Sequence, residues 1–314
     1  MNIIHHEAIK KALSKDAVIQ AVCDAFIAHS EGRIESPSPM HMTYSNEEGD
    51  RIGDCHVKAA HSNAHPVIAI KLAVGFYENA AKGLPVNNGL VMLLSRETGE
   101  PTTLLLDEGW LTTYRTAAAG ALAASLAETD TEDVLGIVGT GSQAFEQADW
   151  TAHHLGLKNV LVFGRSAEKA EALGETLRSR GLNARRAESV AELCAASRVV
   201  ITTTPASEPV VRPADLPEPA RPIHFVAMGS DTYGKQELDV EILRSATTIV
   251  VDDKEQCLDH GEAAAASAVQ AIDPGQLVSM GLALTSGLKI REGVSVVDLT
   301  GLGAQDLAIA SLVA

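Results

Sequence analysis

Residues 134–144 read Val-Leu-Gly-Ile-Val-Gly-Thr-Gly-Ser-Gln-Ala, and this stretch decides the fold. Its short apolar run predicts a buried strand, and the residues after Ala144 predict a helix. Gly139, Gly141 and Ala144 match the pattern G-x-G-x-x-A where strand gives way to helix. Such a loop turns tightly, approaches a pyrophosphate with its backbone and packs its helix closely on its strand. The predicted cofactor-binding residues are Gly139, Thr140, Gly141, Ser142, Gln143 and Ala144.

Downstream of this loop, short apolar runs alternate with helical stretches. The predicted strands are residues 134–138, 160–163, 199–203, 223–228, 248–251 and 294–298, with a helix at 167–180 after the second. Alternation of this kind is typical of right-handed βαβ units and a parallel sheet. We therefore expect an α/β fold in which residues 129–302 form a Rossmann-type, doubly wound NAD(P)-binding domain.

Upstream, the pattern is different. Residues 8–29 have helical spacing, and strands are predicted at 53–60, 66–75, 89–94 and 102–106. Strands that follow one another without helices indicate an antiparallel sheet. A long helix at 111–126 follows, with Thr112 or Thr113 as its cap. We expect residues 1–128 to form an α+β domain, with the boundary near 128–132 and a last helix, 303–314, returning to it.

The end of the second parallel strand favours one nicotinamide cofactor over the other. An NAD site usually has an acidic residue about 20 residues after the glycines, to bind the ribose 2′-hydroxyl. Residues 163–166 are instead Phe-Gly-Arg-Ser. Arg165 can pair with a 2′-phosphate, or stack on adenine while NAD binds. The sequence therefore predicts NADP or NAD as cofactor, with NADP slightly favoured, and adds Arg165 and Ser166 to the cofactor-binding residues.

Composition excludes several classes of protein. Twenty-five Lys and Arg against 41 Asp and Glu give a formal net charge of −16 over 314 residues, which would repel nucleic acid. The four cysteines are scattered without a C-x-x-C pair, so neither a metal site nor a disulfide framework is expected. The N-terminus lacks the apolar core of a signal peptide, and no run is long enough to span a membrane. We expect a cytoplasmic protein without nucleic-acid or membrane partners.

Seven blocks of sequence together resemble the ornithine cyclodeaminase/μ-crystallin family. They are residues 70–71, 75–79, 82–85, 88–90, 111–117, 139–144 and 298–307. The resemblance implies a homodimer built through the antiparallel domain, and a substrate cleft between that domain and the Rossmann domain. It also implies NAD(P)-dependent chemistry on amino acids and imines.

The resemblance assigns two residues to substrate binding. Lys71 matches the family's catalytic lysine, and Arg115 matches the arginine that binds the substrate's α-carboxylate. A lone lysine in the apolar run 67–75 is costly to bury without a partner, and the charge of Arg115 opposes the dipole at a helix start. An anionic ligand would offset both penalties. The alternative is a structural ion pair with an acid of the first domain.

Two other positions favour different reactions. Asp231 matches the catalytic aspartate of ornithine cyclodeaminase, although aspartate is also a common turn residue. Lys58 stands where ornithine cyclodeaminase carries a glutamate, and it suits a second substrate carboxylate better than a distal ammonium. His56 shares the strand face of Lys58, and we interpret it as a surface or packing residue.

We therefore predict an NAD(P)H-dependent oxidoreductase that reduces a small imine or ketimine, or oxidises the corresponding amino acid, at the α-carbon. Lys71 and Asp231 are the predicted catalytic residues, and Lys58, Lys71 and Arg115 the substrate-binding ones. One alternative is an ornithine cyclodeaminase that recycles its NAD. The other is a non-catalytic, NADPH-binding protein like μ-crystallin.

Overall fold

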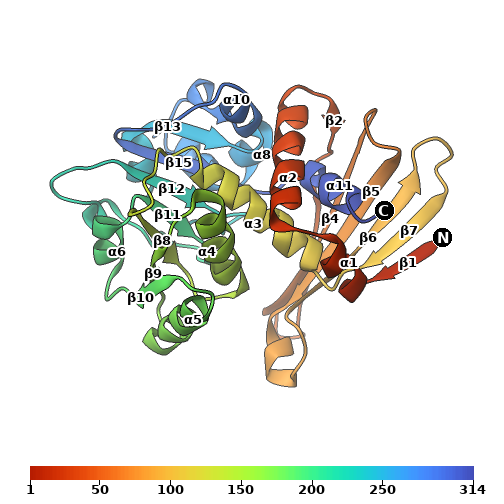
Figure 1. The fold of residues 1–314 in the computed structure, drawn as a ribbon, viewed down its shortest axis with the longest axis horizontal. Helices are drawn as coiled ribbons and strands as arrows, with labels where there is room; N and C mark the ends of the chain where they lie inside the picture. Colours follow the sequence, from red (N-terminus) through yellow and green to blue (C-terminus); the bar gives the residue numbers. More distant parts are fainter. The chain divides into compact units, whose positions relative to one another are not determined.

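The chain folds into two compact units. The computed structural model describes residues 1–314, Arg51 and Ala80 for their backbone alone. The first unit contains Met1–Arg115 and Leu302–Ala314, and the second contains Thr116–Gly301 (Figure 1). The division falls inside a helix, ahead of the boundary expected at 128–132. The boundary near 128–132 stays a prediction, because the end of a compact unit need not coincide with the end of a domain.

The first unit is built on one sheet whose order is β1-β7-β6-β5-β4-β2, with β3 also paired to β4. Its strands are β1 (Asn2–His5), β2 (Ile34–Glu35), β3 (Met40–Ser45), β4 (Arg51–Ser62), β5 (Val67–Phe76), β6 (Asn87–Ser95) and β7 (Pro101–Leu106). All neighbours are antiparallel except β1, which runs parallel to β7. Gly99 has a φ of 74° in the β6–β7 turn, as the predicted hairpin requires.

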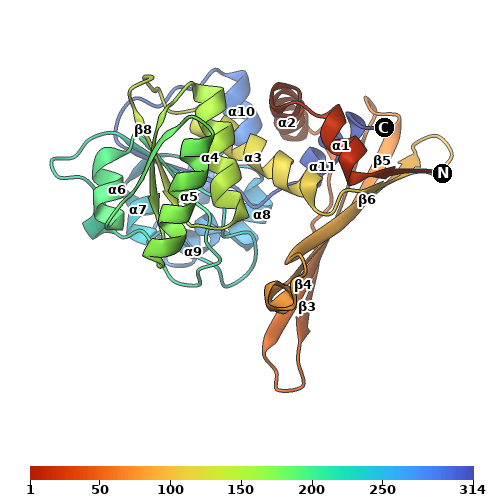
Figure 2. The ribbon, with the colours of Figure 1, turned by 60° about the horizontal axis from the view of Figure 1, so that its bottom comes forward.

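Helices cover one face of this sheet. They include α2 (Lys15–Ser30) and α11 (Gly303–Ser311), which lie on the same side of the strands in Figure 2. The other helices are α1 (His6–Ala12), η1 (Tyr77–Lys82) and the start of α3 (Trp110–Ala124). The single helix expected at 8–29 is wrong. Ser14 accepts a hydrogen bond from the Ala17 amide at 3.3 Å and so begins a second helix instead.

The two faces of the sheet differ in burial. On the helix-covered face, Val91, Leu93 and Leu105 are completely buried. Ile70 and Leu72 on β5 point to the opposite face and are only half-buried. This second face is therefore apolar without being covered by a helix of the described part of this unit.

The second unit has an eight-stranded, wholly parallel sheet. The strand order is β10-β9-β8-β11-β12-β15-β13-β14. The strands are β8 (Val134–Val138), β9 (Asn159–Phe163), β10 (Asn183–Arg186), β11 (Val199–Thr202), β12 (Ile223–Ala227), β13 (Ala246–Val251), β14 (Val278–Ser279) and β15 (Val294–Asp298). Because the order reverses between β8 and β11, this is a doubly wound sheet with its switch point there. The predicted fold class is confirmed.

Helices connect most of these strands (Figure 1). They are α4 (Ser142–Leu155), α5 (Ala167–Ser179), α6 (Val190–Ala196), α7 (Val240–Ser245), α8 (Lys254–Asp259), α9 (Glu262–Ala268) and α10 (Met280–Thr285), with short turns η2 (Pro213–Asp215) and η3 (Pro274–Gln276). Within the part of the chain that the structure describes, no helix is both long and apolar enough to cross a membrane.

Candidate functional site

The loop after β8 has the geometry of a nucleotide-binding turn. Gly139 has a φ of 132°, and a Cβ atom there would lie 2.3 Å from the Thr203 hydroxyl oxygen at the end of β11. Only glycine fits this position. The loop therefore lies at the switch point of the sheet, where parallel sheets of this type bind ligands.

The start of α4 leaves its first amides without a side-chain cap. Gly141 is the N-cap residue, and the first turn of the helix contains no acidic residue. A Cβ atom on Gly141 would meet nothing within 4 Å, so the space beside the helix start is open. Uncapped amides and the helix dipole favour an anion at this point. The position therefore suits the pyrophosphate of a dinucleotide.

A cavity of about 690 Å³ adjoins this loop. Three cationic side chains line it: Arg165 after β9, Lys169 on α5, and Arg212 after β11. Sequence reasoning identified the first of these and missed the other two. Lys169 lies in the first turn of α5, four residues after Arg165, so the sequence alone could have identified it. Arg212 belongs to a different loop, and only the fold brings it to the same cavity.

Other predicted cofactor-binding residues have structural roles in this loop. The hydroxyl of Ser166 caps α5 by accepting from the Lys169 amide at 3.2 Å. Gln143 accepts a hydrogen bond from Gln147 at 3.3 Å within α4. Ala144 is fully buried, in agreement with close helix–strand packing. Whether Ser166 and Gln143 also bind the cofactor stays a prediction.

The first unit contains a buried cluster of three cations and one carboxylate. Lys71 on β5 lies directly opposite Lys58 on β4. The Lys71 Nζ is 2.9 Å from the Asp306 Oδ2 on α11, and the Arg115 Nε on α3 is 3.3 Å from the Asp306 Oδ1. The three cations are between 2% and 8% exposed. The structure thus brings Lys58, Lys71 and Arg115 together, as the sequence predicts, around an acid that it did not assign.

Burial and mutual repulsion change the protonation of this cluster. Burial, helped by the nearby charges of Arg115 and Lys58 and opposed by Asp306, lowers the pKa of Lys71 to about 7. Burial alone would raise the pKa of Asp306, but Lys71, Arg115 and Lys58 hold it below its usual range. Near neutral pH, Lys71 is therefore able both to donate and to accept a proton.

A buried amide donor beside Arg115 points to a ligand. The Gln305 Oε1 accepts a hydrogen bond from the Arg115 Nη1 at 3.1 Å. The Nε2 of Gln305 has no hydrogen-bond acceptor in the structure, and the Nε of Arg115 lies 3.3 Å from the Asp306 Oδ1. Buried donors are rarely left unmatched, and a carboxylate would satisfy them. Gln305 and Asp306 lie within the block 298–307, but nothing in the sequence shows that they reach Arg115 and Lys71.

Asp107 positions the helix that carries Arg115. Its Oδ2 accepts a hydrogen bond from the Leu111 amide at 2.9 Å, and burial raises the pKa of its carboxyl. The expectation that Thr112 or Thr113 caps α3 is wrong, because the hydroxyl of Thr113 donates back to the Gly109 carbonyl at 3.0 Å. An acid at the helix start is the better cap, since its negative charge also interacts favourably with the positive end of the helix dipole.

Asp231 lies in the second unit, in the loop after β12. Its Oδ1 is 2.6 Å from the Nζ of Lys235, and its side chain is partly exposed. The buried carboxylate of Glu237 fixes the surrounding loops by accepting hydrogen bonds from Thr202, Thr204 and Gly229. Asp231 is therefore held at the carboxyl edge of the parallel sheet, and its role stays a prediction.

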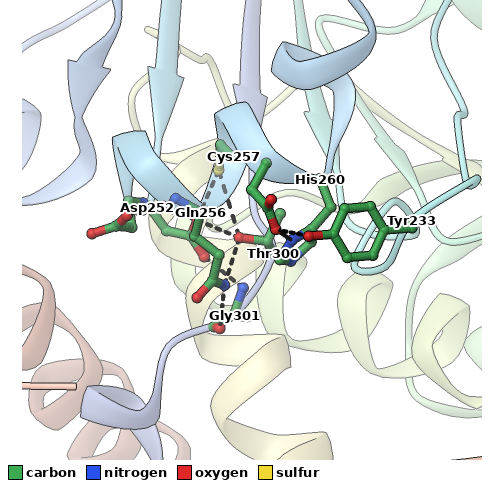
Figure 3. Close-up of polar contacts among 9 residues, drawn as sticks. Tyr233, Asp252, Gln256, Cys257, His260, Thr300 and Gly301 are labelled. Carbon is green, nitrogen blue, oxygen red and sulfur yellow. Dashed lines mark hydrogen bonds and ion pairs between the residues drawn. The ribbon is translucent and has the colours of Figure 1, made fainter. Parts of the chain in front are cut away.

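A second polar network holds the end of the segment after β15 (Figure 3). Asp252 accepts hydrogen bonds from the Thr300 hydroxyl at 3.0 Å and the Gly301 amide at 2.6 Å. Gln256 donates to the Thr300 hydroxyl and to the Gly301 carbonyl. These contacts fix the backbone at the carboxyl ends of β13 and β15. Among the described residues, no group of three acidic, histidine or cysteine side chains could hold a metal ion.

Comparison with known proteins gives a consistent result. The family model for the ornithine cyclodeaminase/mu-crystallin family matches residues 2–314, which confirms the resemblance seen in the sequence. Alanine dehydrogenase of Archaeoglobus fulgidus is 31% identical over 318 residues, covering 99% of this chain and 93% of that protein.

Two solved structures are similar over the whole chain. An archaeal alanine dehydrogenase dimer with bound NAD has a TM-score of 0.88 and 30% identity, covering 100% of this chain and 94% of that chain. The iminosuccinate reductase of Paracoccus denitrificans in complex with NAD⁺ also has a TM-score of 0.88, with 26% identity, covering 100% of this chain and 95% of that chain.

The lowered pKa of Lys71 predicts a specific pH dependence of stability. Folding lowers this pKa from 10.5 to about 7, so between these values the unfolded chain binds more protons than the folded chain. The free energy of unfolding should therefore rise with pH, by up to about 1.4 kcal/mol per pH unit from this group. Chemical denaturation between about pH 7.5 and 9 should show this excess slope in the wild type and not in Lys71→Met. Lys11→Met, at an exposed lysine, should keep the wild-type slope; equal slopes in all three proteins would contradict the assignment.

Proposed function

We propose that this chain, which belongs to the ornithine cyclodeaminase/mu-crystallin family, is an NAD(P)H-dependent oxidoreductase acting on small imines or the corresponding amino acids. In the reductive direction, an imine, NAD(P)H and one proton give an amine and NAD(P)⁺. The names of the alanine dehydrogenase and the iminosuccinate reductase support this class of reaction, and both were solved with NAD bound.

The observation that carries the proposal is the buried cluster of Lys58, Lys71 and Arg115 around Asp306. In a protein of net charge −16, two buried cations, Lys71 and Arg115, share the buried carboxylate of Asp306, and the buried Lys58 lies opposite Lys71. Burying cations that outnumber their acids is unfavourable unless an anion joins them. A substrate carboxylate supplies that anion and also accepts a hydrogen bond from the unmatched Nε2 of Gln305.

Each residue of the cluster has a defined part in this reaction. Arg115 binds the α-carboxylate, with Gln305 fixing the orientation of its guanidinium. Lys71 supplies the proton to the substrate nitrogen, or removes it in the oxidative direction, because its pKa is about 7. Asp231, in the second unit, stays a predicted acid–base residue of the same reaction. A bound nicotinamide supplies or accepts the hydride at the α-carbon.

The cofactor proposal rests on the loop after β8 and the cavity beside it. Gly139, Gly141 and the uncapped start of α4 receive the pyrophosphate. Arg165, Lys169 and Arg212 line the same cavity with a single acidic residue, Glu208, so its charged lining is mainly cationic. That lining favours the 2′-phosphate of NADP, so we propose NADPH as the preferred cofactor and NADH as an alternative one.

Lys58 favours a net redox reaction over cyclodeamination. It is buried on the same sheet face as Lys71, close enough to lower the pKa of that lysine. A cyclodeaminase must bind a substrate with a distal ammonium. Two like charges about 4 Å apart repel by about 4 kcal/mol at an effective dielectric constant near 20. The distal ammonium of ornithine would therefore be disfavoured beside Lys58.

We also propose a homodimer built through the uncovered face of the first unit's sheet. That face carries half-buried apolar side chains on three adjacent strands, among them Ile70, Leu72, Leu90 and Met92. A contiguous apolar surface of this kind is typical of an oligomer interface. The related archaeal alanine dehydrogenase was solved as a dimer.

The cytoplasmic location stays a prediction, consistent with four free cysteines.

The activity should depend on Lys71 and Arg115. With NAD(P)H and a panel of cyclic imines, or of 2-oxo acids with ammonia, wild type should consume cofactor. Lys71→Ala and Arg115→Ala should lower kcat/KM by about 10²–10⁴-fold, the usual range for a lost acid–base group. Cofactor affinity should stay near that of wild type, as should every property of Lys82→Ala, at an exposed lysine of the same unit. Efficient conversion of ornithine to proline with catalytic NAD⁺ and no net absorbance change would identify a cyclodeaminase instead.

The cofactor preference should depend on Arg165. Removing a charge-assisted hydrogen bond to a phosphate is worth about 1.5–3 kcal/mol, so Arg165→Ala should raise the Kd for NADPH about 10- to 100-fold. The Kd for NADH should change less than about threefold. Fluorescence titration measures both, with Lys158→Ala, at the other end of β9, as the control. Tighter binding of NADH than of NADPH by the wild type would rule out the proposed preference.

The dimer interface can be tested with one apolar position. Leu72→Asp places a charge in the centre of the uncovered face and should convert a dimer into a folded monomer. Light scattering after gel filtration measures the mass, and circular dichroism shows that the variant is folded. Leu282→Asp, at an exposed leucine of α10, should remain dimeric. A wild type that is monomeric at micromolar concentration would refute the proposed dimer.

A further inference from the structure

One wall of the cofactor cavity is held by residues behind it. Thr204, Ala206 and Val210, in the segment after β11, line this wall. The carboxylate of Glu237 accepts hydrogen bonds from the Thr204 amide at 2.5 Å and the Thr204 hydroxyl at 2.8 Å, and its backbone carbonyl accepts one from the Val210 amide at 2.8 Å. The Gln236 amide donates to the Ala206 carbonyl at 2.9 Å. The shape of the wall therefore depends on these two residues, neither of which is among the described residues that line the cavity.

Glu237 also joins the ends of two neighbouring strands. Its Oε2 accepts hydrogen bonds from the Thr202 hydroxyl at the end of β11 and from the Gly229 amide after β12, each at 2.7 Å. A Cβ atom on Gly229 would lie 2.0 Å from the Thr204 carbonyl oxygen, so this close approach requires glycine. With four hydrogen bonds from its surroundings, the buried carboxylate fixes the edge of the sheet beside the cavity.

The buried carboxylate of Glu262 on α9 holds Glu237 in turn. Its Oε1 accepts hydrogen bonds from the Glu237 amide at 2.7 Å and from the Ser230 hydroxyl, and its Oε2 accepts one from the Leu238 amide at 3.1 Å. In each of these contacts the carboxylate accepts, which matches its ionised form. Two carboxylates therefore connect α9, through Glu237, to the wall of the cofactor cavity.

Glu262 exchanges a proton near neutral pH. Burial, helped by the charge of Glu237 and opposed by the three hydrogen bonds, raises the pKa of Glu262 to about 7. Asp298 on β15 is also buried, and burial together with the charge of Glu262 raises the pKa of Asp298 well above its usual range. The two acids disfavour each other's ionised form, so Glu262 is the group of this cluster that titrates near neutral pH.

Other titratable groups on the surrounding elements are exposed, paired or neutral. The exposed ones are on α7 and α8, the helices packed against α9: Glu241, Arg244, Lys254, Glu255 and Asp259. Asp231 and Lys235 form an ion pair at 2.6 Å in the loop after β12. His260, between α8 and α9, is 3.1 Å from Asp259, and burial raises the pKa of the Cys257 thiol well above its usual range. Glu237 and Asp298 are therefore the charges that act most directly on Glu262.

A proton on Glu262 weakens its hold on the wall. The carboxyl group then carries a donor of its own, and backbone amides cannot accept from it. The Ser230 hydroxyl is the partner that can reverse its role, which removes one hydrogen bond that Glu262 accepts. The amides of Glu237 and Leu238 then donate to a neutral group, and such hydrogen bonds are about half as strong as those to a charged one.

We propose that Glu237 and Glu262 are positioning residues of the cofactor site, and that the dinucleotide binds best when Glu262 is ionised. This inference rests on the proposed function and names a regulation of its cofactor site. Glu237 holds the wall formed by residues 204–210, and Glu262 holds Glu237 through backbone amides. Both act through that wall rather than by contact with the dinucleotide. Binding of the dinucleotide near neutral pH therefore releases a proton from Glu262.

Fluorescence titration of NADH at several pH values tests the proposal without turnover. NADH is the suitable probe because its pyrophosphate does not titrate near neutral pH. The wild-type Kd should rise about tenfold from pH 8 to pH 6, because a group with a pKa of about 7 loses its ionised form over this range. Glu262→Gln keeps the size of the side chain but cannot ionise, so its Kd should be about tenfold higher than that of the wild type at pH 8 and constant across the range. Glu255→Gln, at an exposed glutamate of α8, should keep the wild-type profile.

A second variant shows whether the two acids are coupled. Glu237→Gln removes the charge that helps to raise the pKa of Glu262, so the midpoint of the profile should move to lower pH. Its Kd at pH 8 should also rise, because an amide places donors against the donors that Glu237 now accepts from. A merely structural role would weaken binding without moving the midpoint. Circular dichroism at each pH shows whether the proteins are folded, and the wild-type profile with this variant decides the question if Glu262→Gln does not fold.

The outcomes separate this proposal from the proposed function. A wild-type Kd that changes less than twofold between pH 6 and pH 8, or the same profile in wild type and Glu262→Gln, would overturn the positioning role and leave the proposed function intact. If NADH binds with the expected profile while no imine or 2-oxo acid is reduced, the proposed function fails and the positioning role is supported. If neither NADH nor NADPH binds at any pH, both fail.

Discussion

The ion pair between Lys71 and Asp306 is the constraint on which the first unit depends. A lysine in the middle of an apolar strand is stable only if another element brings an acid to it. That acid lies 235 residues away in the chain, on α11. The C-terminal helix must therefore return to the sheet of the first unit, and its position is set by charge as well as by packing.

The same ion pair organises the neighbouring side chains. Arg115 also contacts Asp306, and Asp107 caps the helix that carries Arg115. Since one carboxylate pairs with two cations, neither cation is fully neutralised. Removing Asp306 would leave several buried charges without a partner, which usually destabilises a protein by about 3–5 kcal/mol. The cluster is thus a structural element as well as the proposed binding site, so both interpretations of Lys71 and Arg115 involve the same contacts.

Local sequence predicted the fold well where burial follows a simple period. β8 and β15 are parallel strands buried on both sides, and their apolar runs match the structure residue for residue. The short strands β10 and β14 have no such run and were missed. Ser14 also shows the limit of periodicity, because a single capping hydroxyl divides a regular helical pattern. The candidate site was also predicted only in part. Lys71 can be identified from the sequence because it is the single charge in an apolar strand. Asp306 and Gln305 can be assigned to the site only from the fold, which brings distant segments together.

The cluster also connects anion binding to proton transfer. Burial and two neighbouring cations lower the pKa of Lys71 to about 7, so its ammonium gives up a proton more readily than that of an exposed lysine. A carboxylate that binds beside Lys71 adds an opposite charge and raises this pKa. In the proposed reaction, substrate binding would therefore favour the protonated lysine that the substrate nitrogen needs next. In the oxidative direction the same shift reverses when the anion leaves, and the proton is released to water. A single buried lysine can in this way couple recognition of the α-carboxylate to acid–base chemistry at the adjacent carbon.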